Sequence, residues 1–246
     1  MSDATQNHKT PSSGQALLAV RDLYAGYGED EVLHGLSLEV GLGEVVTLVG
    51  RNGAGKSTIM RSVMGILPRR KGSIVVNGCE TIALPPERIA RLGVGYVPEE
   101  RGIFSRLSVE ENLHLPRVVG VDPMPVGHIF ELFPNLRERL SSQGTKLSGG
   151  EQQMLAIARV LRTGARFLLL DEPTEGLAPV IVQQIGRTVG TLKAAGFTIL
   201  LVEQNIHFAS TVSDRYFVIE EGHVVDRLPR LETADAVSRL ERYLGI

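Results

Sequence analysis

The chain has 246 residues, of which 43% are hydrophobic, and this suits one α/β domain with a sizeable core. A formal net charge of −2 gives no reason to expect nucleic acid as a partner, and the single cysteine, Cys79, rules out an internal disulfide. The longest apolar runs, 167–170 and 198–202, are too short to span a bilayer, so any membrane role must come from contact with other subunits.

Polar residues dominate the start of the chain, and residues 1–15 are predicted to form a disordered tail unlike a signal peptide. Strands are predicted at 17–24, 35–40, 44–49, 73–76, 95–97, 167–170, 198–202 and 215–220, with a hairpin turn at 221–223. Helices are predicted at 56–65, 109–115, 150–162, 179–195 and 234–244. Strands that alternate with helices predict a mostly parallel sheet with helices on both faces. Residues from about 101 to 162 predict an inserted helical subdomain.

Residues 50–58 match the pattern G-x-x-x-x-G-K-[ST] between a predicted strand and a predicted helix, which is the context that a phosphate-binding loop requires. The predicted nucleotide-binding residues of this loop are Gly50, Arg51, Asn52, Gly53, Ala54, Gly55, Lys56, Ser57 and Thr58. Glycines let the backbone wrap around phosphates, so that amides and the helix N-terminus face the negative charge. Lys56 is expected to reach the terminal phosphates and assist catalysis, and Ser57 to ligate Mg²⁺.

An apolar run at 167–170 ends in two acids, Asp171 and Glu172. This pattern predicts a buried central strand whose tip emerges beside the phosphate loop. We expect Asp171 to hold Mg²⁺ and Glu172, one residue further out, to act as the base for an attacking water. A strand that simply ends in solvated acids is the alternative, and the phosphate loop upstream favours the functional interpretation.

Residues 147–153 read Leu-Ser-Gly-Gly-Glu-Gln-Gln, and at this point the chain resembles the ABC transporter ATPase family, of which this is the signature motif. Ser148, Gly149 and Gly150 open a helix, so that a hydroxyl and backbone amides converge as an anion site. In that family the motif caps the γ-phosphate of ATP bound to the opposite subunit. The resemblance implies an ATPase with ATP and Mg²⁺ as ligands. It also implies a P-loop NTPase core, an N-terminal antiparallel β subdomain and a helical subdomain, within a single ABC ATPase domain at 16–246.

Further family positions follow from the same resemblance. Tyr27, within Gly-Tyr-Gly, matches the aromatic residue that stacks on adenine, and a tyrosine of the core or of a turn is the alternative. Residues 175–178 match the loop that crosses the dimer interface. The basic run 69–71 is predicted to be a solvated loop, and residues 99–101 begin the region that contacts the membrane subunits in the family.

Two residues depart from the commonest family pattern: Glu99 stands where most members have Gln, and Gln204 where most have His. Both departures, together with the sequences at 152–159, 177–179 and 243–245, resemble the ATPases of branched-chain amino acid importers and of related urea and amide importers. The Val-Glu-Gln-Asn form at 202–205 resembles the smaller, LivF-type subunit. Glu99 is then expected to ligate Mg²⁺ as an anion, and Gln204 to position phosphate and water through a neutral amide rather than a cation.

The resemblance implies a chain that powers uptake of branched-chain (hydrophobic) amino acids through two separate transmembrane permease subunits. A second related ATPase subunit, or a second copy of this chain, would complete the dimer, and an external solute-binding protein would act indirectly, with no nucleic acid involved. The expected location is the cytoplasmic face of the inner cell membrane, as a peripheral subunit. The alternatives are a urea or amide importer and a lipopolysaccharide exporter, whose ATPase normally keeps the Gln and the His that are missing here.

Overall fold

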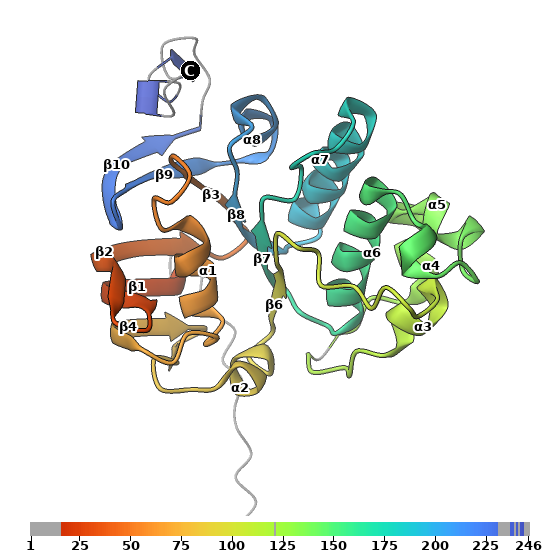
Figure 1. Ribbon diagram of the computed structural model, residues 1–246, viewed down its shortest axis with the longest axis horizontal. Helices are drawn as coiled ribbons and strands as arrows, with labels where there is room; N and C mark the ends of the chain where they lie inside the picture. The colour runs from red at the N-terminus through yellow and green to blue at the C-terminus, as the bar shows by residue number, and fades with distance from the viewer. Residues whose placement is uncertain (1–15, 121, 231–236, 239, 241, 244–246) are drawn as a thin grey trace, which may run out of the picture.

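The computed structural model describes residues 16–120, 122–230, 237, 238, 240, 242 and 243, which form two sheets with helices packed around them (Figure 1). The predicted tail 1–15 and most of the predicted helix 234–244 lie outside the described residues.

An antiparallel sheet with the order β2-β1-β4-β5 contains β1 (Ala16–Tyr27), β2 (Asp30–Gly41), β4 (Arg70–Val76) and β5 (Cys79–Glu80). The second sheet has the order β10-β9-β3-β8-β7-β6. Its strands are β3 (Val45–Val49), β6 (Val94–Val97), β7 (Phe167–Asp171), β8 (Thr198–Val202), β9 (Arg215–Glu220) and β10 (His223–Pro229). Neighbouring strands from β6 to β9 pair in parallel, and β10 forms an antiparallel hairpin with β9. The predicted mostly parallel sheet, the antiparallel sheet and the terminal hairpin are thus confirmed.

The helices are α1 (Lys56–Val63), α2 (Pro86–Ala90), α3 (Val109–His114), α4 (Val126–Leu132), α5 (Pro134–Glu138), the 3-10 turn η1 (Gly144–Lys146), α6 (Gly149–Arg162), α7 (Pro179–Ala194) and α8 (Ile206–Val212). Figure 1 shows α1 on the side of the antiparallel sheet and α3, α4, α5 and α6 together on the opposite side of β7. The predicted helices at 56–65, 109–115, 150–162 and 179–195 match α1, α3, α6 and α7 to within two residues at each end.

The central strands β3, β7 and β8 are buried along their whole length, because the sheet has a hydrophobic core on each face. Alternate residues point to opposite faces of a strand. In β7, Leu169 joins the core with α1 and the antiparallel sheet, whereas Leu168 and Leu170 join the core with α6 and α7. Continuous apolar runs are therefore required in these strands. Their carboxyl ends share one edge of the sheet, and this is where a ligand site forms in open parallel sheets.

Two helices of the helical side begin with reciprocal side-chain caps. In α3 the hydroxyl of Ser108 accepts a hydrogen bond from the amide of Glu111, whose carboxylate in turn accepts one from the amide of Ser108. Ser148 and Glu151 form the same box at the start of α6. These caps fix where both helices begin, since they satisfy backbone donors that have no partner inside the helix.

Gly95 allows β6 to pack closely under α6. A Cβ atom placed on Gly95 would lie 2.2 Å from Cγ1 of Val160 and 2.9 Å from Cβ of Ala165. We expect Gly95→Ala to lower the free energy of unfolding by about 1–3 kcal/mol, because the extra methyl group overpacks a filled space. Adding Val160→Ala should recover part of this loss, as urea unfolding of the single and double variants would show.

Gly190 provides the matched control, because it is exposed in α7 and a Cβ there would meet nothing within 4 Å. Gly190→Ala should raise stability by about 0.5–1 kcal/mol, since it removes backbone freedom from the unfolded chain without a clash. Equal effects of the two substitutions would contradict the packing account.

Candidate functional site

The phosphate-loop residues lie between β3 and α1 and are held tightly against β9. A Cβ atom on Gly50 would lie 2.2 Å from the carbonyl oxygen of Ile219, so only glycine allows this approach. Gly55 precedes the first helical residue with φ of 104°, a conformation that disfavours any side chain. The loop backbone is thereby shaped into a cradle at the N-terminus of α1, where amides and the helix dipole favour an anion.

The ammonium group of Lys56 is buried over this cradle. Its Nζ donates hydrogen bonds to the carbonyl oxygens of Gly50 (2.8 Å) and Arg51 (3.0 Å) and lies 3.9 Å from Oε1 of Glu172. Burial lowers the pKa of Lys56, and the negative charges of Glu172, Asp171 and Glu99 partly oppose this effect. A cation that is only 5% exposed at a helix N-terminus is well placed for a charge-assisted contact to a phosphate.

Ser57 and Asp171 meet beside the loop. The Ser57 hydroxyl donates to Oδ1 of Asp171 (3.0 Å), and the Tyr96 hydroxyl donates to Oδ2 (3.0 Å). Burial raises the pKa of Asp171, which is 1% exposed, and the two hydrogen bonds oppose that shift. A hydroxyl and a carboxylate are the oxygen donors that Mg²⁺ prefers. Among the described residues no group of three or more His, Cys, Asp or Glu side chains is arranged to hold a metal. Mg²⁺ usually keeps several waters and binds through one or two protein oxygens plus substrate phosphates, and Ser57 with Asp171 fits that pattern.

Glu172 follows Asp171 at the end of β7 with φ of 45°, which is unusual for a residue with a side chain. Its backbone amide is fixed by a hydrogen bond to the carbonyl oxygen of Val202 in β8 (3.0 Å). Nε2 of Gln204 donates to both carboxylate oxygens of Glu172, at 2.8 and 2.7 Å. Gln204 was expected to reach phosphate and water, and in this structure it restrains the Glu172 carboxylate.

One pocket of about 430 Å³ collects most of the predicted site residues. It is lined by Tyr27, Val32, Asn52, Gly53, Gly55, Lys56, Ser57, Thr58, Glu99, Glu172, Glu175 and Gln204. Tyr27 is 42% exposed, so its ring is available to a ligand. Asp171 lies directly behind Ser57, and Gly50 and Arg51 take part through their carbonyl groups. Arg51 and Ala54 line a neighbouring pocket beside β9.

Glu99 lies at the wall of this pocket. Partial burial, together with the negative charges of Glu172, Glu175 and Asp171, raises the pKa of Glu99. A positive ligand nearby would favour its ionised form, which is consistent with the predicted role beside a cation.

The signature residues lie apart from the phosphate loop of the same chain. Ser148, Gly149 and Gly150 start α6, and Figure 1 shows α6 on the opposite side of β6 and β7 from α1. A Cβ on Gly150 would lie 2.9 Å from Ile181, so this glycine lets α6 approach α7. Within one chain the structure does not bring these residues to the phosphate cradle.

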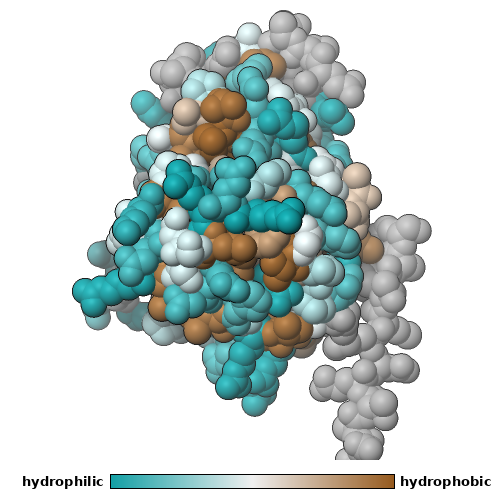
Figure 2. All heavy atoms as spheres, turned by 90° about the vertical axis from the view of Figure 1, so that its right-hand side faces the viewer, coloured by the Kyte–Doolittle hydropathy of each residue, from teal (hydrophilic) through white to brown (hydrophobic). Residues whose placement is uncertain are grey.

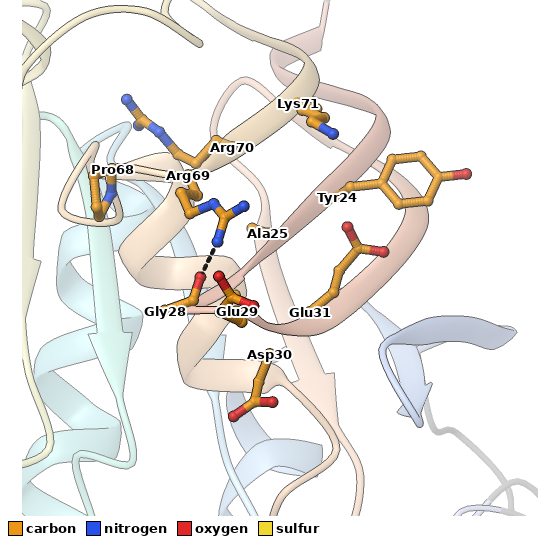
Figure 3. A pocket seen from close by; sticks show the side chains of 11 residues that line it. Tyr24, Ala25, Gly28, Glu29, Asp30, Glu31, Pro68, Arg69, Arg70 and Lys71 are labelled. Carbon is orange, nitrogen blue, oxygen red and sulfur yellow. Dashed lines mark hydrogen bonds between the residues drawn. The ribbon is translucent and has the colours of Figure 1, made fainter.

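The basic run 69–71 is only partly the predicted solvated loop: Arg69 and Lys71 are exposed, but β4 already begins at Arg70. Figure 3 shows the pocket beside the turn between β1 and β2, where the Arg69 side chain donates to the carbonyl oxygen of Gly28. Arg70 begins β4, is half-buried and donates to the carbonyl oxygens of Ser62 (2.8 Å) and Leu84 (3.1 Å). Two of the three cations therefore tie the segment after α1 to its surroundings, because their guanidinium groups reach carbonyl oxygens of neighbouring segments.

Sequence reasoning did not identify Tyr96 and Arg61 as parts of the site. Arg61 donates to the hydroxyl of Tyr27 (3.3 Å), and Tyr96 donates to Asp171. The available signal for Arg61 was its spacing of four residues from Ser57 on α1, which places both on one helix face. Tyr96 gave no comparable signal, because its contact with Asp171 joins two different strands.

Comparison with known proteins gives several matches. The ABC transporter family model matches residues 33–175. The high-affinity branched-chain amino acid transport ATP-binding protein BraG of Pseudomonas aeruginosa is 46% identical over 202 residues, 81% of this chain and 87% of BraG. The lipopolysaccharide export system ATP-binding protein LptB of Escherichia coli K12 is 35% identical over 216 residues, 85% and 89% of the two chains. The probable branched-chain amino acid transport ATP-binding protein LivF of Archaeoglobus fulgidus is 37% identical over 216 residues, 85% and 90% of the two chains.

A solved nucleotide-free ATP-binding cassette from an ABC transporter has the same fold as this chain. Its TM-score is 0.80 at 22% sequence identity, covering 93% of this chain and 96% of that chain.

Glu203 is buried beside the site and does not line the pocket. Its carboxylate accepts hydrogen bonds from the amide (3.2 Å) and hydroxyl (2.7 Å) of Thr174 and from the amides of Gln204 (3.2 Å) and Asn205 (3.1 Å). Burial raises the pKa of Glu203 to about 7 despite these bonds. Glu203 thus joins the loops after β7 and β8 and has its carboxylate occupied by four backbone and hydroxyl donors.

The raised pKa of Glu203 predicts a pH-dependent contribution to stability. The folded chain binds the Glu203 proton more tightly than the unfolded chain, so this contribution is present below the unfolded pKa and is lost as pH rises towards about 7. The stability advantage of wild type over Glu203→Gln should therefore shrink by a few kcal/mol between about pH 4.5 and 7, at ~1.4 kcal/mol per pKa unit. Urea unfolding at several pH values measures this difference. Glu87→Gln, at an exposed position of α2, controls for removal of a carboxyl group, and an advantage that grows with pH would contradict the prediction.

Proposed function

We propose that this chain, which belongs to the ABC transporter family, powers an importer of branched-chain or other hydrophobic amino acids by hydrolysing ATP. The observation that carries the proposal is the single pocket in which Lys56, the Ser57–Asp171 pair and Glu172 converge. The amino acid class follows from the similarity to BraG and LivF, whose names both specify branched-chain amino acid transport.

The phosphates of ATP are bound by the cradle and by Lys56. The ammonium group, now held by two carbonyl oxygens, can turn towards the terminal phosphates and exchange neutral acceptors for charged ones. Tyr27 stacks on the adenine ring, because its exposed side chain lines the same pocket as the phosphate loop.

Ser57 and Asp171 would hold Mg²⁺, and Glu99 would be an additional anionic ligand. When bound, the cation neutralises charge that develops on the transferred phosphate. Asp171 is kept in position for this role by Tyr96, since the Tyr96 hydroxyl fixes the carboxylate oxygen that Ser57 does not contact.

Glu172 accepts the proton of the attacking water. The Gln204 amide contacts both carboxylate oxygens and thereby sets the orientation of the base. Because an amide does not titrate near neutral pH, this restraint is present in one form throughout the physiological range.

A second subunit completes the site. Ser148 and Gly150 belong to the start of α6, which lies across β6 and β7 from α1 of the same chain. Their anion site therefore serves the ATP of a partner ATPase subunit, either a related chain or a second copy. The dimer drives two transmembrane permease subunits from the cytoplasmic face of the inner membrane, and an external solute-binding protein delivers the amino acid. No nucleic acid takes part.

The surface of the helical side supports docking to the permeases. Figure 2 shows patches of hydrophobic side chains among polar ones on the face that contains this side. Phe104, Leu115 and Val118, around α3, are each between 46% and 52% exposed. In the part of the chain that the structure describes, no helix combines the length and the apolar character needed to cross a membrane.

Glu172→Gln tests the enzymatic part of the proposal. The variant keeps its contact with Gln204, because a glutamine oxygen still accepts from Nε2, but it loses the proton acceptor. It should bind Mg·ATP normally, lower kcat by about a hundredfold or more and accumulate as an ATP-bound dimer. Turnover assays and light scattering measure these effects. Glu138→Gln, at an exposed position of α5, should behave as wild type, and near-normal turnover of Glu172→Gln would assign the base elsewhere.

Deletion of the coding sequence tests the transported solute. Uptake of labelled leucine should be lost and should return with wild-type chain but not with Glu172→Gln. Loss of urea or short-amide uptake alone would instead assign the chain to a urea or amide importer. Normal uptake of all these solutes with a defective outer membrane would instead favour the lipopolysaccharide exporter, to whose ATPase the chain is also similar.

A further inference from the structure

Arg61 stands between the two halves of the nucleotide pocket. It lies on α1, four residues after Ser57, and its side chain is 31% exposed. One nitrogen of its guanidinium donates to the Tyr27 hydroxyl (3.3 Å) and another to Oε1 of Glu100 (3.4 Å). The Tyr96 hydroxyl is also close enough to interact electrostatically with the same guanidinium. The planar fork of an arginine can serve several acceptors at once, which a lysine cannot do with fixed geometry.

Three hydrogen bonds and one electrostatic interaction connect the two sides of the site. Arg61 donates to Tyr27, at the end of β1, and interacts electrostatically with Tyr96, in β6. Tyr96 donates to Asp171, and Asp171 accepts from Ser57, which lies on α1 like Arg61. The aromatic residue proposed for the base and the carboxylate proposed for the cation are thus connected through a single guanidinium.

We propose that Arg61 is a positioning residue that couples binding of the adenine base to binding of the divalent cation. A nucleotide that engages the Tyr27 ring fixes the Tyr27 hydroxyl, which orders the Arg61 guanidinium, and Arg61 in turn orders Tyr96 against Asp171. This inference rests on the proposed function, because it requires ATP and a divalent cation to occupy the pocket.

The charges around Arg61 favour such a relay over a purely structural role. Arg70, on the neighbouring segment, ends on the carbonyl groups of Ser62 and Leu84. Arg61 instead ends on the Tyr27 hydroxyl and on the exposed Glu100, and it interacts electrostatically with Tyr96, the tyrosine that holds Asp171. Its partners can therefore change with ligand occupancy, because they are side-chain groups of the pocket and of its surface rather than backbone groups.

The experiment measures the Mg²⁺ concentration for half-maximal binding of ATP and of inorganic tripolyphosphate, which has the phosphates but no base. Tyr27→Phe keeps the ring and removes only the hydroxyl that Arg61 contacts. In the wild-type background it should raise the half-saturating Mg²⁺ for ATP by about threefold, which is the size of one weak hydrogen bond. For tripolyphosphate the same substitution should leave the Mg²⁺ requirement unchanged.

The same substitution is then made beside Arg61→Met and beside Arg61→Lys. Arg61→Met keeps the stem of the side chain, and Arg61→Lys keeps its charge and guards against a variant that fails to fold. In both backgrounds Tyr27→Phe should no longer change the Mg²⁺ requirement for ATP, because the connection to Tyr96 is already broken. Arg137→Met, at an exposed position of α5, is the matched control and should preserve the threefold effect.

An effect of Tyr27→Phe that persists without Arg61, or that is absent in wild type, would overturn the inference. The proposed function is tested separately by Lys56→Ala, which should lose both ATP and tripolyphosphate. If Lys56→Ala still binds both ligands, the proposed function itself is wrong. If Lys56→Ala loses both ligands but the effect of Tyr27→Phe does not depend on Arg61, only the coupling is wrong.

Discussion

Three buried parallel strands that end at one edge position the charged centre of the site. β3 delivers the phosphate loop, β7 delivers Asp171 and Glu172, and β8 delivers Gln204 to the same place. Because both faces of these strands are covered by hydrophobic cores, their polar tips are the first positions where charge can meet solvent. The ammonium of Lys56 and the carboxylates of β7 therefore face each other in a partly dry pocket, where opposite charges interact more strongly than in water. Tyr27, at the end of β1, and Glu99, after β6, complete the pocket around these strand ends.

Gln204 places a neutral amide beside the charged groups at this edge of the sheet. The carboxylate of Glu172 lies between a cation at 3.9 Å and a neutral amide at 2.7–2.8 Å, so its orientation is fixed without a second titrating group. An imidazole in the same position would alternate between charged and neutral forms near neutral pH. Glu203, one residue before Gln204, has a different role, since its four hydrogen bonds hold the loops after β7 and β8 together. Of these two adjacent polar residues, Gln204 thus orients the proposed base, whereas Glu203 supports the scaffold.

The sequence predicts the parts of the site that depend on short patterns. The loop 50–58 and the strand that ends in Asp171 and Glu172 are such patterns, because nearest neighbours along the chain determine both. Contacts between distant segments are not encoded in this way: the contact of Tyr96 with Asp171 spans 75 residues and that of Arg61 with Tyr27 spans 34. Arg70 shows the same limit, since a basic run predicts a solvated loop until the carbonyl groups around it are known. Short elements such as α5, of five residues, were missed because tertiary packing rather than helical periodicity stabilises them.

The left-handed backbone conformation of Glu172 affects which substitutions can stabilise the protein. With φ of 45°, this position suits glycine or asparagine better than glutamate, and the mismatch costs on the order of 1 kcal/mol. Replacement by glycine would relieve the strain while it removes the carboxylate. Random mutagenesis screened only for thermal resistance would therefore select chains that lack the proposed base at this position. Engineering a more robust version of the protein should leave this residue untouched and seek stability in the outer helices instead, because here activity and stability favour different residues.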